Sequence, residues 1–344
     1  MGSGSLSQEA LCRFVQCDSA HPFNLFVFLP ISLLLLSSLV SCLLLRALIP
    51  QLRLRLLDQP NARSSHQRPT PRGGGLVFVL GAALSSALAL IKGIPSGIAL
   101  NGLPLLALPL AVVGFLDDRY NLYAGFRYGV QLVTALLVLV FSPLSPPWIV
   151  LPLLLVGVTA VINFTNFMDG LDGLVAGCMA VTIAALAIAL DAPWPLWALV
   201  GSLLGFLFWN WSPAKVFMGD VGSTFLGAVF AGLVLQSSSW SEAFGYLLVA
   251  TPLLGDACLC VPRRLLAGQR VFEAHRLHLF QRLHQAGWPH ARVSLVYIAA
   301  TVLLAVAMLA GGSPWVFGLA FVELLVGVWL DQRVAVPFAV ASQS

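Results

Sequence analysis

Apolar runs of about 20 residues recur along almost the whole chain, and such a run is long enough to cross the hydrocarbon core of a bilayer as a helix. Runs such as ISLLLLSSLVSCLLL and LPLLLVGVTAVI have no period of two, which argues against an outer-membrane barrel. Only 9% of the 344 residues are charged, whereas a soluble domain carries roughly a quarter. The sequence therefore predicts an all-α polytopic membrane protein.

The polar, Pro and Gly clusters divide the chain into about eleven predicted spans. Their expected limits are 24–49, 73–91, 98–116, 127–143, 148–167, 173–191, 195–211, 221–238, 243–262, 293–311 and 314–332. We expect a single transmembrane domain over residues 24–332, between a non-cytoplasmic tail (1–23) and a cytoplasmic tail (333–344). We expect no signal peptide at the N-terminus. Whether Cys12 and Cys17 in this tail form a disulfide is left open.

Basic residues indicate the orientation of these spans. With the N-terminus outside, the opposite side of the membrane keeps only Arg13 and Lys92. The cytoplasmic loops then hold Arg53, Arg55, Arg63, Arg68, Arg72, Arg119, Arg127, Lys215, Arg263, Arg264, Arg270, Arg276, Arg282 and Arg292. Cytoplasmic loops are enriched in Lys and Arg, so this asymmetry predicts an outside N-terminus and a cytoplasmic C-terminus.

Acidic residues gather at the same predicted face. The segments GFLDDRYNL, NFMDGLDGL, FMGDVGSTFLG and PLLGDACLCVPRR place six aspartates at inner span ends: Asp117, Asp118, Asp169, Asp172, Asp220 and Asp256. One such acid is compatible with a solvated charge at a helix end. Six at one depth repel each other unless cations or protons compensate. Carboxylate oxygens suit Mg²⁺ or Mn²⁺, so the set predicts a divalent-cation site.

The longest polar stretch is the cytoplasmic loop 263–292, which contains EAHRLHLFQRLH. A short interfacial amphipathic helix is expected there, with one face formed by Leu277, Phe280 and Leu283 and another by His275, His278 and Arg282. The histidines have no clean zinc spacing with acids, which disfavours a metal site in this loop. An anionic phosphate held by Arg276, His278 and Arg282 is one interpretation. A basic loop that only enforces topology is the other.

With these motifs in order, the chain resembles the polyprenyl-phosphate N-acetylhexosamine-1-phosphate transferases over about residues 57–290. LDQPNARSSHQRPTPRGGG is similar to the first cytoplasmic loop of that family. GFLDDRYNL, NFTNFMDGLDGL and FMGDVGS resemble its acidic motifs, and EAHRLHLFQRL resembles its His-containing loop. The nearest similarity is to the branch that starts O-antigen or related lipid-linked glycans in bacteria.

The resemblance implies transfer of a sugar 1-phosphate from a UDP-N-acetyl sugar to undecaprenyl phosphate, with release of UMP, at a bacterial inner membrane. It implies Mg²⁺, with Mn²⁺ as an alternative, and the lipid bilayer as a partner. Nucleic acid is not an expected partner, and a homodimer is plausible by analogy only.

The resemblance also implies roles for particular residues. Asp220 would ligate Mg²⁺, with Asp117 as a second candidate ligand. Asp117 would take the proton from the lipid phosphate or orient it, with support from Asp118. The nucleotide site would be lined by Asn166, Asp169 and Asp172. The diphosphate or sugar would be contacted by Arg276 and His278, and further phosphate partners would be Arg127 and Lys215.

The chain departs from the family pattern in the His-containing loop. Many relatives have a His-x-His-His run there, but this chain reads HLFQ, so Phe280 and Gln281 follow His278. The departure argues against a muramoyl-pentapeptide substrate and leaves a plain N-acetylhexosamine and a 6-deoxy N-acetyl sugar open. A secondary transporter with a cytoplasm-facing acidic site is the alternative function. It predicts acids near mid-membrane and an inverted repeat, neither of which the sequence shows.

Overall fold

The computed structural model describes residues 22–342 except 61–64, 67, 94–97 and 270–274. The expectations for most of the N-terminal tail, including Cys12 and Cys17, fall outside the described residues. The predicted positions of Arg13, Arg63 and Arg270 fall outside them as well.

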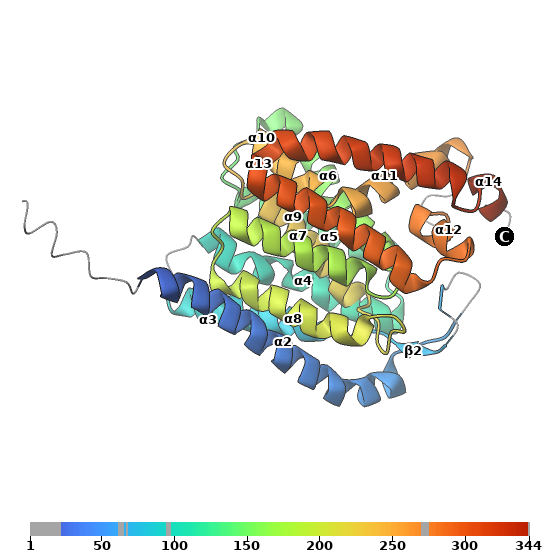
Figure 1. The fold of residues 1–344 in the computed structure, drawn as a ribbon. Helices are drawn as coiled ribbons and strands as arrows, with labels where there is room; N and C mark the ends of the chain where they lie inside the picture. The colour runs from blue at the N-terminus through green and yellow to red at the C-terminus, as the bar shows by residue number, and fades with distance from the viewer. Residues whose placement is uncertain (1–21, 61–64, 67, 94–97, 270–274, 343–344) are drawn as a thin grey trace, which may run out of the picture.

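The described chain is almost entirely helical (Figure 1). The first half contains α2 (Pro22–Arg55), α3 (Leu76–Ile91), α4 (Ile98–Tyr120), α5 (Ala124–Val140), the 3-10 turn η1 (Trp148–Val150), α6 (Leu151–Phe167) and α7 (Leu174–Ala189). The second half contains α8 (Trp194–Asn210), α9 (Asp220–Val234), α10 (Trp240–Leu248), α11 (Thr251–Leu266), α12 (Leu279–Gln285), α13 (His290–Arg333) and α14 (Phe338–Ala341). A two-residue ribbon pairs β1 (Leu57–Asp58) with β2 (Thr70–Pro71), antiparallel.

Each predicted span coincides with helical structure, and the protein is a multi-pass membrane protein. Among the described residues, four helical segments are long and apolar enough to cross a bilayer, namely Pro30–Arg55, Ala99–Tyr120, Trp148–Phe167 and His290–Arg333. The pair α10 and α11 passes the same test as a fifth, and α3, α5, α7, α8 and α9 are shorter apolar helices. The all-α membrane class is confirmed, whereas the number of eleven spans and their orientation stay predictions.

Two of the helical segments are broken. The predicted span 243–262 is two helices, α10 and α11, which meet at an angle of 86°. Pro252, in the first turn of α11, lacks the N–H that would continue the helical ladder, so the predicted span contains a bend that the sequence analysis did not anticipate. Within α13, Gly312 has a φ of 67°, and the chain turns back there (Figure 1). This break separates α13 at the place where the sequence predicted a boundary between two spans.

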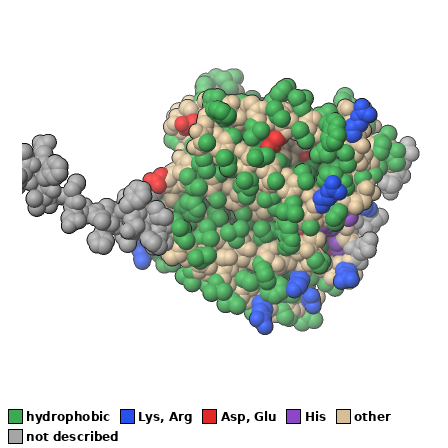
Figure 2. Space-filling view, viewed as in Figure 1, with side chains coloured by type: hydrophobic (Ala, Val, Ile, Leu, Met, Phe, Trp, Pro, Cys, Tyr) green, Lys and Arg blue, Asp and Glu red, His purple; other side chains and the backbone are tan. Residues whose placement is uncertain are grey.

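The outer surface of the bundle is apolar. The side chains of Leu84, Leu153 and Phe321 are 65, 71 and 64% exposed. Exposing so much apolar surface to water is unfavourable, whereas contact with lipid is not. Figure 2 shows hydrophobic side chains over most of one flank, and most of the Lys and Arg side chains in this view lie toward the end where α12 lies. Water and headgroups are therefore expected at that end.

Helix α9 occupies the centre, and all its residues from Val221 to Val234 are buried. It packs against α4 and α6. The approach of α4 is close, because a Cβ at Gly114 would collide with the carbonyl group of Asp220. A small residue at this position lets the backbones approach closely. The contact brings the last turn of α4 beside the first turn of α9.

Candidate active site

A polar pocket of about 540 Å³ opens at one end of the bundle. The last turn of α4, the loop after α6 and the first turn of α9 meet there. Its wall includes Asp58, His66, Arg72, Asp118, Asn166, Asp169, Asp172, Asp220, Gln281 and His290. The predicted convergence of acids is thus confirmed for Asp118, Asp169, Asp172 and Asp220, and Asp117 joins them through Arg127.

Asp118 holds the start of α9 in place. The backbone N–H groups of Asp220 and Val221 donate to its two carboxylate oxygens at 3.2 and 3.4 Å. These are orphan donors of a helix N-terminus, which favour a negative partner. Gly219 precedes them with a φ of 73°, and a Cβ there would collide with the Asp118 carboxylate. Because its side chain is only 2% exposed, Asp118 is a supporting group for α9 rather than an open ligand.

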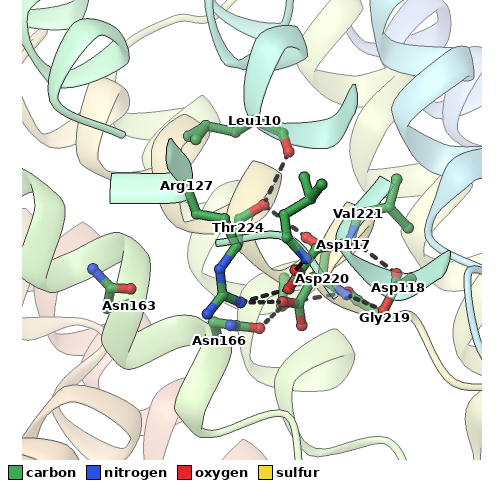
Figure 3. Close-up of polar contacts among 12 residues, drawn as sticks. Leu110, Asp117, Asp118, Arg127, Asn163, Asn166, Gly219, Asp220, Val221 and Thr224 are labelled. Atoms are coloured by element: carbon green, nitrogen blue, oxygen red, sulfur yellow. Dashed lines mark hydrogen bonds and ion pairs between the residues drawn. The ribbon is translucent and has the colours of Figure 1, made fainter. Parts of the chain in front are cut away.

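Arg127 of α5 links two of the acids. Its Nη1 lies 2.5 Å from Asp117 Oδ2 and 3.4 Å from Asp220 Oδ2. Figure 3 shows the guanidinium pointing toward these carboxylates with Asn166 beside it, while Asn163 lies apart from them. Asn166 is fixed in turn, since its Oδ1 accepts a hydrogen bond of 2.5 Å from Ser223 Oγ. The Arg127 guanidinium therefore offsets part of the negative charge of Asp117 and Asp220.

Asp172 is an anchored carboxylate. Its Oδ2 accepts from the N–H of Ala214 at 3.1 Å and lies 3.2 Å from His290 Nδ1. Burial alone would raise the pKa of Asp172, but His290, the Ala214 N–H and Ser212 together lower it. Asp172 thus stays ionised and ties the loop after α6 to α13 and to the loop after α8.

Asp169 has the opposite electrostatic character. Burial, followed by the nearby charges of Asp118 and Asp172, raises the pKa of its carboxyl group to about 7. A buried carboxyl group among other acids is poised for a cation or a hydrogen-bonding ligand.

We predict a pH-dependent effect of Asp169→Asn on stability in the absence of cations and substrate. The folded-state pKa of about 7 exceeds the ordinary value of 3.8, so ionisation costs folded-state stability as pH rises between these values. The amide does not ionise, so the variant should gain more in apparent Tm over the wild type at pH 8 than at pH 5. Asp172→Asn is the matched control and should lose stability, because its pKa is shifted the other way. Equal Tm changes of Asp169→Asn at both pH values would contradict this prediction.

Arg72 and His290 are pocket residues for which sequence reasoning assigned no role. Arg72 follows β2, pairs with Asp58 of β1 and places its Nη1 3.8 Å from Asp118 Oδ1. His290 Nε2 lies 3.2 Å from the carbonyl oxygen of Ser65. The motif LDQPNARSSHQRPTPRGGG was the available signal for Arg72. No local signal identifies His290, because its partners come from other parts of the chain.

Several predicted ligands do not line the pocket. Lys215 is exposed, with Nζ 5.0 Å from the centre of the Trp209 ring. Arg276 is half-buried, and its carbonyl oxygen accepts from Gln285. Arg282 is buried against Asp331 and against the carbonyl oxygens of Leu277 and Val336. To bind a phosphate as predicted, Arg282 would therefore have to give up these internal contacts.

The interfacial helix expected in this loop is shorter than predicted. It starts only at Leu279, so His275 and His278 lie before it rather than on one of its faces. The apolar positions were correct, because Leu277, Phe280 and Leu283 are all buried.

The prediction that Asp256 lies with the other five aspartates is wrong. It lies in α11, 6% exposed, outside the polar pocket. Its carboxylate accepts from the N–H groups of Leu279 and Phe280 at 2.8 and 3.0 Å and from Tyr297 Oη at 2.8 Å. Asp256 therefore holds the start of α12, and its charge is offset inside the protein rather than by a ligand in the pocket. The bend between α10 and α11 comes directly before the helix that carries Asp256, and the predicted spans did not include it.

The donor set of the pocket fits a hard divalent cation. The Asp220 side chain is 28% exposed toward the pocket, whose wall also contains oxygen atoms of Asn166 and Asp169. Mg²⁺ commonly takes one or two carboxylates and completes its shell with phosphate and water. Asp117 is only 11% exposed and already accepts from Arg127 and from the N–H of Leu122. Asp220 is therefore the better placed of the two predicted ligands.

An apolar helix bundle with an acidic, polar pocket at one end is the arrangement of a multi-pass membrane protein with a polar site at the ends of its helices. Residues 100–238 match glycosyl transferase family 4. A Bacillus subtilis relative, the probable undecaprenyl-phosphate N-acetylglucosaminyl 1-phosphate transferase, is 30% identical over 76% of this chain and 79% of its own length.

Two further relatives are similar over most of their length and differ in the sugar that their names give. The decaprenyl-phosphate N-acetylglucosaminephosphotransferase of Mycobacterium leprae is 33% identical over 71% of this chain and 74% of that protein. The phospho-N-acetylmuramoyl-pentapeptide-transferase of Desulforudis audaxviator is 32% identical over 75% and 89%. The chain belongs to the polyprenyl-phosphate N-acetylhexosamine-1-phosphate transferase family, which confirms the resemblance drawn from its motifs.

Proposed function

We propose that this protein transfers an N-acetylhexosamine 1-phosphate from a UDP-sugar to undecaprenyl phosphate and releases UMP. The observation that carries the proposal is the convergence of Asp118, Asp169, Asp172 and Asp220 in one polar pocket at the end of an apolar bundle. A lipid phosphate at the membrane surface and a nucleotide sugar from the cytosol can both reach such a place. The names of the relatives support a polyprenyl phosphate acceptor.

The proposed reaction exchanges one phosphorus–oxygen bond for another. An oxygen of the lipid phosphate attacks the sugar-bearing phosphorus of the UDP-sugar, and the bond to the bridging oxygen breaks. UMP leaves with that oxygen, and the sugar is joined to the lipid through a diphosphate. Phosphoryl transfer of this kind needs mainly positioning and neutralisation of charge. The lipid phosphate is largely ionised near neutral pH, so a strong base is not required.

We assign the residues of the pocket to these tasks. Asp220 would hold Mg²⁺, with Mn²⁺ as a substitute and Asp117 as a further candidate ligand. When bound, this ion supplies positive charge for phosphate oxygens. Arg127, which lies between Asp117 and Asp220, would offset negative charge and orient the lipid phosphate with Asp117. Asp118 keeps the start of α9 in register for this arrangement.

Nucleotide recognition is assigned to the residues at and after the end of α6. Asn166, Asp169 and Asp172 belong to the loop after α6 or to the last turn of that helix. Of these three, Asp169 is best suited to contact a ligand, because Asp172 is held by His290 and Ala214. Lys215, Arg276 and His278 lie outside the pocket wall, so phosphate or sugar contacts by them would require movement of their loops.

The biological setting proposed is initiation of O-antigen or a related polysaccharide at the cytoplasmic face of a bacterial inner membrane. The HLFQ run in place of consecutive histidines disfavours a muramoyl-pentapeptide donor. UDP-N-acetylglucosamine and a UDP-linked 6-deoxy N-acetyl sugar are the two proposed donors.

The test is a donor panel with purified full-length protein in detergent. Undecaprenyl phosphate and Mg²⁺ would be mixed with UDP-N-acetylglucosamine, UDP-N-acetylgalactosamine and UDP-linked 6-deoxy N-acetyl sugars, and UMP and lipid-linked sugar would be quantified. We expect one donor to yield UMP and lipid product in equal amounts, with loss of turnover in EDTA and recovery with Mg²⁺. Absence of UMP from every donor, or UMP without a lipid product, would refute the proposed reaction.

A further inference from the structure

A second cluster of metal-binding side chains lies outside the polar pocket. Cys260 comes from α11, and His275 and His278 come from the segment before α12. One ligand atom from each of the three side chains lies within 4.8 Å of the others. The sequence disfavoured a metal site here because the histidines lack zinc spacing with acids, but the third ligand is a thiol on a different element.

His278 has the surroundings of a metal ligand. Its ring is 2% exposed, and Nδ1 lies 3.3 Å from Asp256 Oδ1. Its Nε2 is buried and has no hydrogen-bond partner among the described residues. A buried polar nitrogen without a partner has lost its hydration with nothing in return, which a ligand would supply. Metal-binding histidines typically give one nitrogen to the metal and the other to a carboxylate, and Asp256 supplies this carboxylate.

The nearby arginines already have partners. Arg282 pairs with Asp331, and Arg264 Nε donates to Gln269. Asp331 therefore offsets part of the positive charge that Arg282 brings near the cluster.

We propose that Cys260, His275 and His278 bind one Zn²⁺ ion. A thiolate with two imidazoles selects a borderline-soft cation such as Zn²⁺ over Mg²⁺. Zinc distances of about 2.0–2.3 Å place the ligand atoms roughly 3.5 Å apart, so the segment carrying His275 would close by about 1 Å. The fourth position is left to water. The ion would fasten the segment before α12 to α11, and it would withdraw His278 from the sugar or diphosphate contact that the family resemblance implies.

The experiment uses the purified full-length protein, stripped with a chelator and then given Zn²⁺ or Co²⁺ alone. Metal content is measured by mass spectrometry, and Co²⁺ binding is followed by its thiolate charge-transfer absorption. We expect one Zn²⁺ per chain and a thiolate band with Co²⁺. Cys260→Ser should abolish the band and weaken Zn²⁺ binding at least tenfold. Cys258→Ser is the matched control, because Cys258 is exposed on the same helix, and it should behave as the wild type.

Two results would overturn the zinc site. One is a stripped wild-type protein that takes up no more Zn²⁺ than Cys260→Ser does, and the other is a thiolate band that persists in Cys260→Ser. Zn²⁺ held by oxygen atoms of the polar pocket gives no thiolate band, so it counts against the proposal if it is the whole uptake. Cys260→Ser replaces only one atom, and equal Tm values of the metal-free proteins would show that folding is intact. Transferase activity is not part of the readout, so the two proposals can fail separately.

Discussion

Asp220→Asn is expected to lower the transfer rate by about 10²–10³-fold, the usual cost of removing one preorganised group that stabilises developing charge. The amide keeps the shape of the side chain and leaves the backbone N–H of residue 220 donating to Asp118. It removes the carboxylate charge that faces the pocket and lies near Arg127. The expected loss therefore belongs to binding of Mg²⁺ and of phosphate charge rather than to folding. Initial rates of UMP release at saturating substrates measure it.

The control is Glu242→Gln, the same chemical change near the start of α10. Helix α9 begins at the pocket and ends before α10 begins, so Glu242 lies toward the opposite end of the bundle. Its carboxylate accepts hydrogen bonds from the N–H and Oγ of Ser238, just before α10, so the variant should keep wild-type activity. Wild-type turnover in Asp220→Asn, or an equal loss in both variants, would refute the assignment of Asp220.

The largest effect on stability is expected from Asp256→Ala. The carboxylate is buried and pairs with His278 while accepting from two backbone N–H groups and from Tyr297. Removing one partner of such a buried pair typically costs about 3–5 kcal/mol, because the groups that remain lose their charge partner and their acceptor. Thermal unfolding in detergent should show an apparent Tm about 5–10 °C lower than that of the wild type.

Tyr297→Phe provides the graded comparison for Asp256→Ala. It removes one hydrogen bond to Asp256 and leaves the charge pair and both backbone bonds intact. We expect a loss of about 1 kcal/mol. If Asp256→Ala lost no more stability than Tyr297→Phe, the inference that Asp256 stabilises the start of α12 would be wrong.

Local sequence patterns predicted most of the helices. Length and apolarity decide whether a segment forms a membrane helix, and both are readable within about 20 residues. The break between α10 and α11 escaped this reasoning, although Pro252 stood in the segment. Proline also occurs inside α4 at Pro104 and Pro109 without ending that helix, so the residue type alone does not locate a break.

The residues of the candidate site were likewise only partly predictable from the sequence. Asp117, Asp118, Asp169 and Asp220 were predictable because each sits at a span end, and span ends on one face must lie at one depth. Asp256 met the same criterion and was placed wrongly with them. The bend before α11 and the packing of α12 put it among internal donors, and neither is visible in the spacing of residues along the chain.

The sequence by itself determined a polytopic helical protein, a face where aspartates and basic side chains gather, and motifs specific to one enzyme family. These features depend on composition and local order. Only the tertiary structure decided that His290 anchors Asp172, that Arg127 bridges two aspartates and that Cys260 lies beside His275 and His278. These residues are separated along the chain and meet through helix packing. Contacts of this kind depend on how apolar surfaces fit together, which no local pattern records.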